Sequence, residues 1–311
     1  MKIIYGITGI RKYKRPVAAL GVFDGVHRGH RNILKTAVAE ARNINGTSIV
    51  LTFWPHPQKE ESLYSLPHRL KLIEELGVDV CIVINFNKKF AGVTAADFIT
   101  GILIEKLRVH AVYVGENFRF GKNAEGDANI LKQFSKTYNF KLKIFKIIRV
   151  KHDAVSSTYI RNLIRQGELR AAGKLLGRPV SVLGTVIRGI SLAKQLGFPT
   201  ANINPHHEVL PPPGVYSAAV FFNKHPFMGV CYIGTKPTIN HRPRVTGKKP
   251  RDVIHVEAHI FDFHQNIYGK DLEIQFIKKI RNERKFNTLE FLSKQIKKDV
   301  IYAKAQMPST N

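Results

Sequence analysis

Residues 20–30 have the sequence LGVFDGVHRGH, and this stretch decides the fold of the first half of the chain. An apolar, strand-like run leads into an Asp-Gly turn, and apolar residues then recur at helical spacing. The stretch is therefore predicted to join the end of a strand to the first turn of a helix. His27 and His30 lie at that helix start, where free backbone N–H groups and the helix dipole favour a phosphate group.

The residue types around the two histidines suit nucleotidyl transfer. Two imidazoles can donate hydrogen bonds to a phosphate that gains negative charge in a transition state, and glycines let the main chain approach it closely. The alternative is an ordinary turn with two surface histidines, which the neighbouring aromatic residue and the Asp-Gly turn disfavour. The predicted catalytic residues are His27 and His30, and the predicted phosphate-binding residues are Gly21, Phe23, Asp24, Gly25 and Gly29.

Length and composition are those of an ordinary globular protein. The chain has 311 residues, enough for two domains that each bury a core, with 44% hydrophobic and 23% charged residues. It contains no apolar run long enough to span a bilayer, and its N-terminus lacks the basic-then-apolar order of a secretory signal. Cys81 and Cys231 are the only cysteines and lie far apart. Neither a disulfide framework nor a metal cluster is predicted from them, and the cytoplasm is the expected compartment.

The charge of the chain allows two classes of partner. The formal net charge is +26 and the pI is about 10.1, values that ordinarily point to nucleic acid. However, the lysines and arginines are spread along the whole chain, and phosphorylated small molecules benefit from positive potential as well. We expect weak adsorption to nucleic acid at low salt and no specific nucleic-acid partner.

The pattern of elements changes in the middle of the chain. Strands predicted at 17–22, 48–53, 80–86, 111–114 and 142–150 alternate with helices at 69–76, 95–107 and 130–138, which favours a doubly wound parallel sheet, a Rossmann-like α/β domain. After a helical stretch over 160–176, short β-like runs separated by Pro and Gly predict a small all-β barrel, which one helix over 289–303 follows. The predicted domains are residues 1–178 and 179–305, with a polar tail over 306–311.

Two further motifs follow the histidines in the first half. Residues 114–121, VGENFRFG, come directly after a predicted strand, and residues 156–161, SSTYIR, open a predicted helix. Hydroxyls at a helix start with an arginine one turn further on can hold a pyrophosphate, although the same six residues alone also describe a simple N-capped helix. Together the three motifs resemble the flavin branch of the HxGH nucleotidyltransferases. Residues 1–178 resemble the FMN adenylyltransferase module of the bacterial bifunctional riboflavin kinase/FMN adenylyltransferases, also called FAD synthetases.

This resemblance implies a reaction and a set of roles in the first module. The FMN phosphate attacks the α-phosphorus of ATP in line and pyrophosphate leaves, so positioning and charge stabilisation carry the rate. The resemblance implies that His27 and His30 hold the ATP phosphates and that Arg161 neutralises the leaving pyrophosphate. It also implies ATP or phosphate binding by Asn117, Ser156, Ser157 and Thr158, and flavin binding by Phe53, Pro55 and His56.

The second half carries its own candidate site. Residues 184–203 read GTVIRGISLAKQLGFPTANI, in which Gly184 and Gly189 bracket a turn able to approach phosphate closely. Thr200 and Asn202 lie two residues apart on an extended segment and face the same way, and their hard oxygens suit Mg²⁺. Taken alone, the tetrapeptide that contains them is equally compatible with a short polar turn. The whole string resembles the signature of riboflavin kinase.

The kinase resemblance implies four further roles. Glu257 would be the general base that takes the proton of the ribityl 5′-hydroxyl, although an alternating strand also accommodates it as a surface carboxylate. Thr200 and Asn202 would hold Mg²⁺ and the ATP phosphates. Arg281 would lie in a flavin-side loop, with Glu283 as a second flavin-binding residue.

The kinase module departs from the family pattern at several positions. Ala193-Lys194 replaces the usual Gly-Arg, Tyr232 stands where relatives commonly have Asn, and Asn266-Ile267 replaces Asp-Leu. Ala193 can stiffen a loop that needs glycine, and Lys194 loses a bidentate donor. The sequence predicts an enzyme that converts riboflavin to FMN and FMN to FAD with ATP and Mg²⁺. The alternatives are an FMN adenylyltransferase with a weakened kinase module and a basic nucleic-acid-binding protein on a nucleotidyltransferase scaffold.

Overall fold

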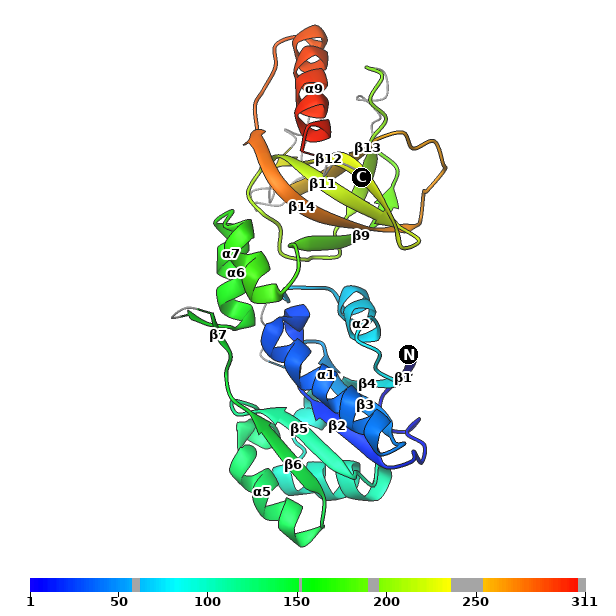
Figure 1. Cartoon of the computed structure of the whole chain (residues 1–311), viewed down its shortest axis with the longest axis vertical. Helices are drawn as coiled ribbons and strands as arrows, with labels where there is room; N and C mark the ends of the chain where they lie inside the picture. Colours follow the sequence, from blue (N-terminus) through cyan, green and yellow to red (C-terminus); the bar gives the residue numbers. More distant parts are fainter. Residues whose placement is uncertain (58–61, 151–152, 190–195, 236–253, 307–311) are drawn as a thin grey trace, which may run out of the picture. The chain divides into compact units, whose positions relative to one another are not determined.

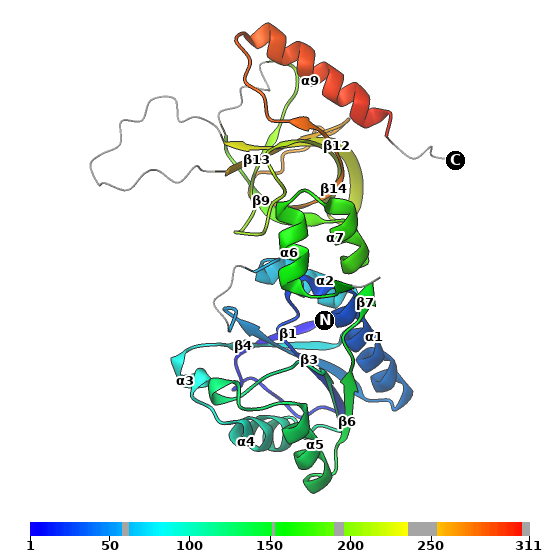
Figure 2. The ribbon, with the colours of Figure 1, turned by 90° about the vertical axis from the view of Figure 1, so that its left-hand side faces the viewer.

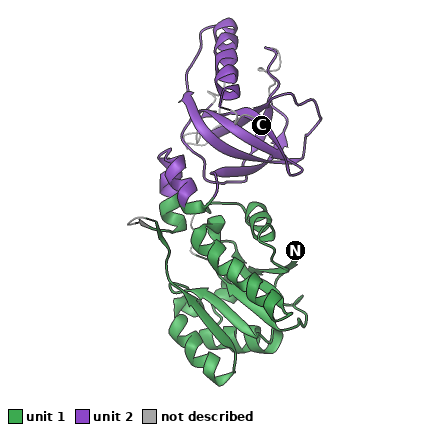
Figure 3. Ribbon diagram, viewed as in Figure 1, with its two compact units in different colours: residues 1–160, 175–177 green, residues 161–174, 178–311 purple. Residues whose placement is uncertain are grey.

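The chain forms two compact units in the computed structural model (Figure 3). The structure describes residues 1–57, 62–150, 153–189, 196–235 and 254–306 (Figure 1). The first unit comprises residues 1–160 and 175–177, and the second comprises residues 161–174 and 178–311. The helical stretch before the predicted boundary at 178 is thus divided between the units, and most of it belongs to the second.

The first unit is built on a six-stranded parallel sheet with the order β1-β4-β3-β2-β5-β6. From β2 the chain adds β3 and β4 on one side, then crosses to add β5 and β6 on the other. The topological switch point therefore lies between β2 and β5, where open α/β sheets bind ligands at the carboxyl ends of the strands. The strands are β1 Lys2–Tyr5, β2 Pro16–Leu20, β3 Thr47–Trp54, β4 Val80–Asn85, β5 Ala111–Gly115 and β6 Lys141–Phe145.

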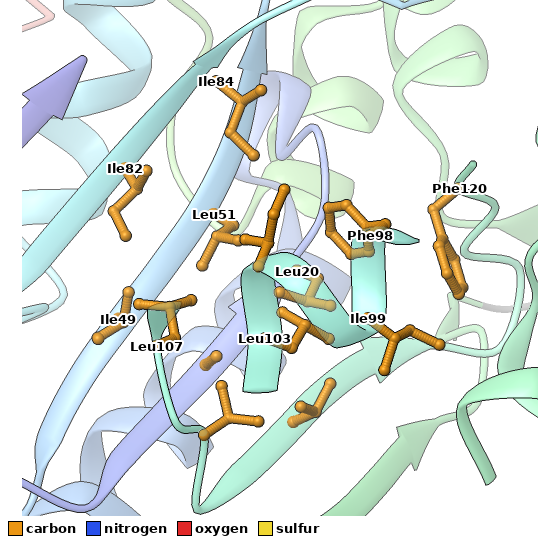
Figure 4. Packing of buried hydrophobic residues seen from close by; sticks show 14 of the residues in the cluster. Leu20, Ile49, Leu51, Ile82, Ile84, Phe98, Ile99, Leu103, Leu107 and Phe120 are labelled. Carbon is orange, nitrogen blue, oxygen red and sulfur yellow. The ribbon is translucent and has the colours of Figure 1, made fainter. Parts of the chain in front are cut away.

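Helices cover both faces of this sheet, as its continuous apolar strands require. Helix α1 (Arg28–Asn43) buries the residues that the sequence placed on its apolar face, Ile33, Leu34, Ala37, Val38 and Ala41. A second group of side chains packs alternate residues of β2, β3 and β4 against the π-helix η2 (Phe98–Lys106), as Figure 4 shows. The other helices of this unit are α2 Leu66–Glu74, α3 Lys88–Ala91, α4 Ala95–Asp97 and α5 Ala128–Thr137 (Figure 2).

The doubly wound sheet is confirmed, and three of its predicted elements differ in detail. The helix predicted at 95–107 begins as expected at Ala95, after the N-cap Thr94, whose hydroxyl accepts the Asp97 N–H, but continues as a π-helix. The strand predicted at 142–150 is two strands, β6 and a short β7 (Arg149–Val150) that pairs with β8 (Asp153–Ala154). The helix predicted at 160–176 is two helices, α6 (Ser157–Arg165) and α7 (Leu169–Leu176), because Gly167 between them has φ +83°.

The second unit contains a closed antiparallel barrel with the strand order β10-β13-β12-β11-β14-β9, which confirms the predicted all-β module. In β13 alternate residues, Val256, Ala258 and Ile260, are buried in the interior. The intervening residues face outward. The elements are β9 Ser181–Ile187, β10 Ala201–Asn204, β11 Gly214–Phe222, β12 His225–Thr235, β13 Ile254–Ile260, β14 Asp271–Asn282 and helix α9 Leu289–Lys304.

Candidate active sites

The turn after β2 is held by a buried carboxylate. Asp24 is 2% exposed, and its carboxylate accepts the backbone N–H groups of Leu63 at 2.9 Å and Tyr64 at 3.2 Å. Phe23 precedes it in the left-handed region, with φ 53°, and is buried. The Asp24 carboxylate therefore positions the turn. Its role in phosphate binding stays a prediction.

The two histidines stack on one another at the start of α1. Their ring centroids lie 3.5 Å apart with an interplanar angle of 19°, and the edge of Phe23 contacts His30 at 5.3 Å. The Nδ1 atom of His27 accepts the backbone N–H of His30 at 3.4 Å, so His27 is the N-cap of the helix. This bond places the proton of neutral His27 on Nε2. The stacked pair thus has an Nε2–H donor at the positive end of a 16-residue helix.

Glycines allow this compact arrangement, each for a different reason. Gly25 has φ +79°, and a Cβ atom there would lie 2.3 Å from the Leu63 side chain. A Cβ atom at Gly29 would lie 3.1 Å from the His27 ring, and one at Gly21 would lie 3.0 Å from the Phe23 ring. Gly29 therefore admits the His27 ring, while Gly21 and Gly25 accommodate the packing of the turn.

The start of α6, at residues 156–158, lies beside the turn that carries Asp24. The hydroxyl of Ser157 donates to the backbone carbonyl of Asp24 at 2.7 Å, across 133 residues of sequence. The hydroxyl of Ser156 accepts the Tyr159 N–H at 3.2 Å and so caps the start of α6. Thr158 lies in the first turn of the same helix. Arg161 is 5% exposed and belongs to the second unit.

The remaining predicted residues of the first unit follow the neighbouring strands. Asn117 comes after β5, and a Cβ atom at Gly115 would lie 3.1 Å from its side-chain oxygen. Phe53 lies near the end of β3 and is buried, with its ring 6.3 Å from that of Phe86. Pro55 and His56 follow β3 directly. These residues therefore lie at the carboxyl ends of β3 and β5, on either side of the strand that leads to the histidines.

Arg69 is a buried cation that the sequence did not identify. It is 0% exposed, and its Nη1 atom donates to the carbonyl oxygens of Val22 at 2.9 Å and Phe53 at 3.3 Å. It therefore ties together the chain segments that leave β2 and β3. Burial lowers the pKa of its guanidinium, and the charge of Asp24 raises it in part. An arginine on the apolar face of a short predicted helix was the only available signal.

The second site is a single row of residues across the outward face of the barrel. Strand register pairs Asn202 with Glu257, Glu257 with Tyr232, Tyr232 with Val215, and Val215 with Arg281. Directly opposed residues share one face, with Cβ atoms about 4.5–5.5 Å apart. Three predicted site residues, distant in sequence, are thus aligned by the ladder.

The predicted metal-binding residues lie at one end of this row. The Thr200 hydroxyl donates to the Glu257 carboxylate at 3.3 Å. A Cβ atom at Gly189 would lie 2.1–2.5 Å from the Asn202 amide, so only glycine admits that side chain. Among the described residues no group of three His, Cys, Asp or Glu side chains is placed to hold a metal. Hydroxyl and amide oxygens fit a Mg²⁺ ion that takes its remaining ligands from water and nucleotide phosphates.

Two predicted site residues of the second unit also have structural contacts. Arg281 lies within β14 rather than in a loop, and its guanidinium forms hydrogen bonds of 2.9–3.0 Å to Asp299 of α9. A Cβ atom at Gly184 would lie 2.4 Å from the Asn204 carbonyl oxygen, so this glycine permits β9 and β10 to close the barrel. The Ala193-Lys194 departure lies outside the described residues.

Two residues beside Glu257 were not assigned roles from the sequence. The His259 ring lies on the same outward face as Glu257 and forms a hydrogen bond through Nδ1 to the Pro199 carbonyl at 2.8 Å, directly before Thr200. The period-two alternation of this strand was the signal that could have found it. The Tyr232 hydroxyl donates to the Glu283 carboxylate at 2.5 Å, a contact that depends on barrel register and was not visible in the sequence.

Comparisons with known families cover both units. A model of the FAD synthetase family matches residues 10–159, and a model of the riboflavin kinase family matches residues 176–307. Within the described part of the chain, no helix combines the length and the apolar character needed to cross a bilayer.

Relatives match over almost the whole chain. The bifunctional riboflavin kinase/FMN adenylyltransferase of Buchnera aphidicola is 35% identical, with 96% of this chain and 97% of the relative covered. The protein of the same name from Escherichia coli K12 is 34% identical, covering 98% and 97%. A crystal structure titled as a macrolide-efflux protein from Streptococcus pneumoniae has a TM-score of 0.83 at 26% identity, covering 99% of this chain and 100% of that one. The chain belongs to the family of bifunctional riboflavin kinase/FMN adenylyltransferases.

Proposed function

We propose that the chain carries out both reactions of its family at the two sites described above, riboflavin phosphorylation on the barrel and FMN adenylylation at the histidine turn. The observation that supports this division most directly is the separation of the two residue sets. The stacked histidines belong to the first unit, and the row of Asn202, Glu257 and Tyr232 belongs to the second.

At the first site, a phosphate oxygen of FMN attacks the α-phosphorus of ATP and the bond to the β-phosphate oxygen breaks. FAD and pyrophosphate are the products. His27 and His30 donate hydrogen bonds to the phosphate that gains charge, helped by the dipole of α1. Asn117, Ser156, Ser157 and Thr158 complete the nucleotide-binding set of the first unit, and Phe53, Pro55 and His56 contribute to the flavin side.

At the second site, the 5′-hydroxyl oxygen of riboflavin attacks the γ-phosphorus of ATP, and FMN and ADP are the products. Glu257 accepts the proton that the hydroxyl loses. The Thr200 hydroxyl, which donates to Glu257, orients that carboxylate in the free enzyme. The ladder holds Asn202 beside it, with Gly189 leaving room for the amide.

We assign Mg²⁺ to the Thr200 and Asn202 end of the row. When bound, the ion neutralises phosphate charge and orients the nucleotide. Hydroxyl and amide ligands alone would hold Mg²⁺ weakly, so Thr200 and Asn202 would need the ATP phosphates as further ligands. The proposed substrates are ATP, riboflavin and FMN, the proposed compartment is the cytoplasm, and no specific nucleic-acid partner is proposed.

Chromatography of the flavin products tests this division. The purified protein is incubated with ATP and Mg²⁺ and either riboflavin or FMN. We expect FAD from both substrates in the unchanged protein. His30→Ala should stop FAD formation and still produce FMN from riboflavin, whereas Glu257→Gln should stop FMN formation and still convert FMN to FAD.

Each alternative has its own result in this experiment. FAD from FMN alone in the unchanged protein would identify a weakened kinase module. Equal loss of both activities in either variant would contradict the separation of sites. A third result would favour a nucleic-acid-binding protein instead: no flavin product forms, and the protein binds oligonucleotides at physiological salt.

A further inference from the structure

Tyr232 occupies the centre of the row formed by Asn202, Glu257, Tyr232, Val215 and Arg281 on the outward face of the barrel. Its backbone pairs with Glu257 on one side and with Val215 on the other, and its side chain lies on the outward face that carries Glu257. Its hydroxyl donates to the carboxylate of Glu283, which follows the last residue of β14. One phenol therefore connects the strand beside the proposed base to the segment proposed to contact flavin.

The contact depends on a glycine in the neighbouring backbone. A Cβ atom at Gly234 would lie 2.0 Å from the Tyr232 hydroxyl and 2.3 Å from a carboxylate oxygen of Glu283. Glycine at this position therefore lets the two side chains meet above β12. The hydrogen bond thus depends on Tyr232 and Gly234 of β12 and on Glu283 after β14. This dependence indicates a specific contact rather than a chance approach of two surface groups.

The chemistry of the pair keeps the hydrogen bond in one direction. Burial raises the pKa of the Tyr232 phenol, and the neighbouring Glu283 and Glu257 carboxylates raise it further. The phenol consequently remains a neutral donor at neutral pH. A carboxylate has two oxygens that accept hydrogen bonds, so Glu283 can accept from Tyr232 with one and from a hydroxyl or N–H of a substrate with the other.

We propose that Tyr232 is a positioning residue that sets the affinity of the kinase site for riboflavin by fixing Glu283 at the end of the row that carries Glu257. The inference rests on the proposed kinase site. The alternative is that the hydrogen bond only stabilises the barrel. The two differ because a purely stabilising contact would change unfolding without changing flavin affinity.

The test compares two tyrosine variants that each remove one hydroxyl from the barrel. Tyr232→Phe removes the proposed positioning bond. Tyr216→Phe is the matched control, because Tyr216 lies on the adjacent strand β11 and its buried hydroxyl donates to the backbone carbonyl of Pro212. Riboflavin affinity is measured by quenching of flavin fluorescence without ATP, and KM and kcat for phosphorylation are measured separately.

We expect Tyr232→Phe to weaken riboflavin binding and raise KM about tenfold, the loss that corresponds to one hydrogen bond to a charged group at about 1.4 kcal/mol. The loss should fall on Kd and KM more than on kcat. Glu283→Ala, which removes the acceptor, should weaken binding at least as much, and the double variant should be no worse than Glu283→Ala, because Tyr232 acts through Glu283. Tyr216→Phe should leave riboflavin affinity unchanged.

Riboflavin Kd and KM within twofold of the unchanged protein in Tyr232→Phe would overturn the inference, as would equal weakening by Tyr216→Phe. Additive losses in the double variant would also overturn it. These results are distinct from a failure of the proposed function. The proposed function would fail if Glu257→Gln phosphorylated riboflavin at the normal rate. That test concerns a different residue from the two tyrosines.

Discussion

Replacement of Asp299 by asparagine should destabilise the second unit and leave the first unit intact. The Asp299 side chain is 4% exposed and accepts three hydrogen bonds from Arg281, at 2.9–3.0 Å, with a fourth from Gln295 at 2.9 Å. Asparagine keeps the shape of the side chain and removes its charge. The Arg281 guanidinium then remains in place without its counter-ion.

The size of the effect follows from the burial of the two partners. Removal of one member of a fully buried ion pair costs about 3–5 kcal/mol. The Arg281 side chain is 21% exposed, so water reaches part of the guanidinium and reduces that cost. We therefore expect a loss of about 2–3 kcal/mol in the free energy of unfolding, below the full range for a buried pair.

Urea unfolding followed by two signals measures this loss. The single tryptophan, Trp54, ends β3 of the first unit, so its fluorescence follows that unit, while circular dichroism follows both. The matched control is Glu290→Gln, which breaks the exposed pair with Lys294 on the same helix, an interaction of about 0.3–0.5 kcal/mol at most. The reasoning would be refuted if the urea midpoint of Asp299→Asn by circular dichroism were no lower than that of Glu290→Gln. A shift of the Trp54 fluorescence transition instead would refute it as well.

Three further predictions concern groups with defined surroundings. Gly189→Ala should reduce riboflavin phosphorylation more than about tenfold while FMN adenylylation persists, because the new methyl group overlaps the Asn202 amide; equal activity would show that Asn202 is dispensable. Burial raises the pKa of Cys81 to about 12 and that of Cys231 further still, so neither thiol should react with a thiol reagent at pH 8 before urea unfolds the protein. Because the folded thiols stay protonated while unfolded thiols ionise near their ordinary pKa of about 8.5, their contribution to stability should be complete below that pH and decline as pH rises above it. Urea midpoints at pH 7, 9 and 10 measure the decline, and a rise would contradict it.

The sequence predicted the regular elements well because each is encoded by local spacing. The five buried positions of α1 follow its 3.6-residue period, and the alternation of β13 identified its inward and outward faces. The alternating order of strands and helices was sufficient for a parallel sheet, and short strands between Pro and Gly were sufficient for a barrel.

Hydrogen-bond partners that lie far apart in the sequence could not be predicted from local spacing. The backbone groups that bind the Asp24 carboxylate lie 39 and 40 residues away, and Asp299 lies 18 residues from Arg281 on a different element. Local spacing cannot report either pairing. The contact of Asp24 with the turn backbone and the ion pair of Arg281 with Asp299 were therefore not predicted.

The outward position of the kinase row separates its chemistry from the packing of the barrel. Residues such as Val256 and Ala258 fill the interior, while Glu257 between them does not contribute to that volume. An exchange on the outer face, such as the tyrosine at 232, leaves the core undisturbed. The histidine turn is different, because Phe23 and Asp24 are themselves core residues. A substitution at an outward position such as 257 should thus change the kinase site at little cost to folding, whereas a substitution at Phe23 or Asp24 should affect both folding and the site.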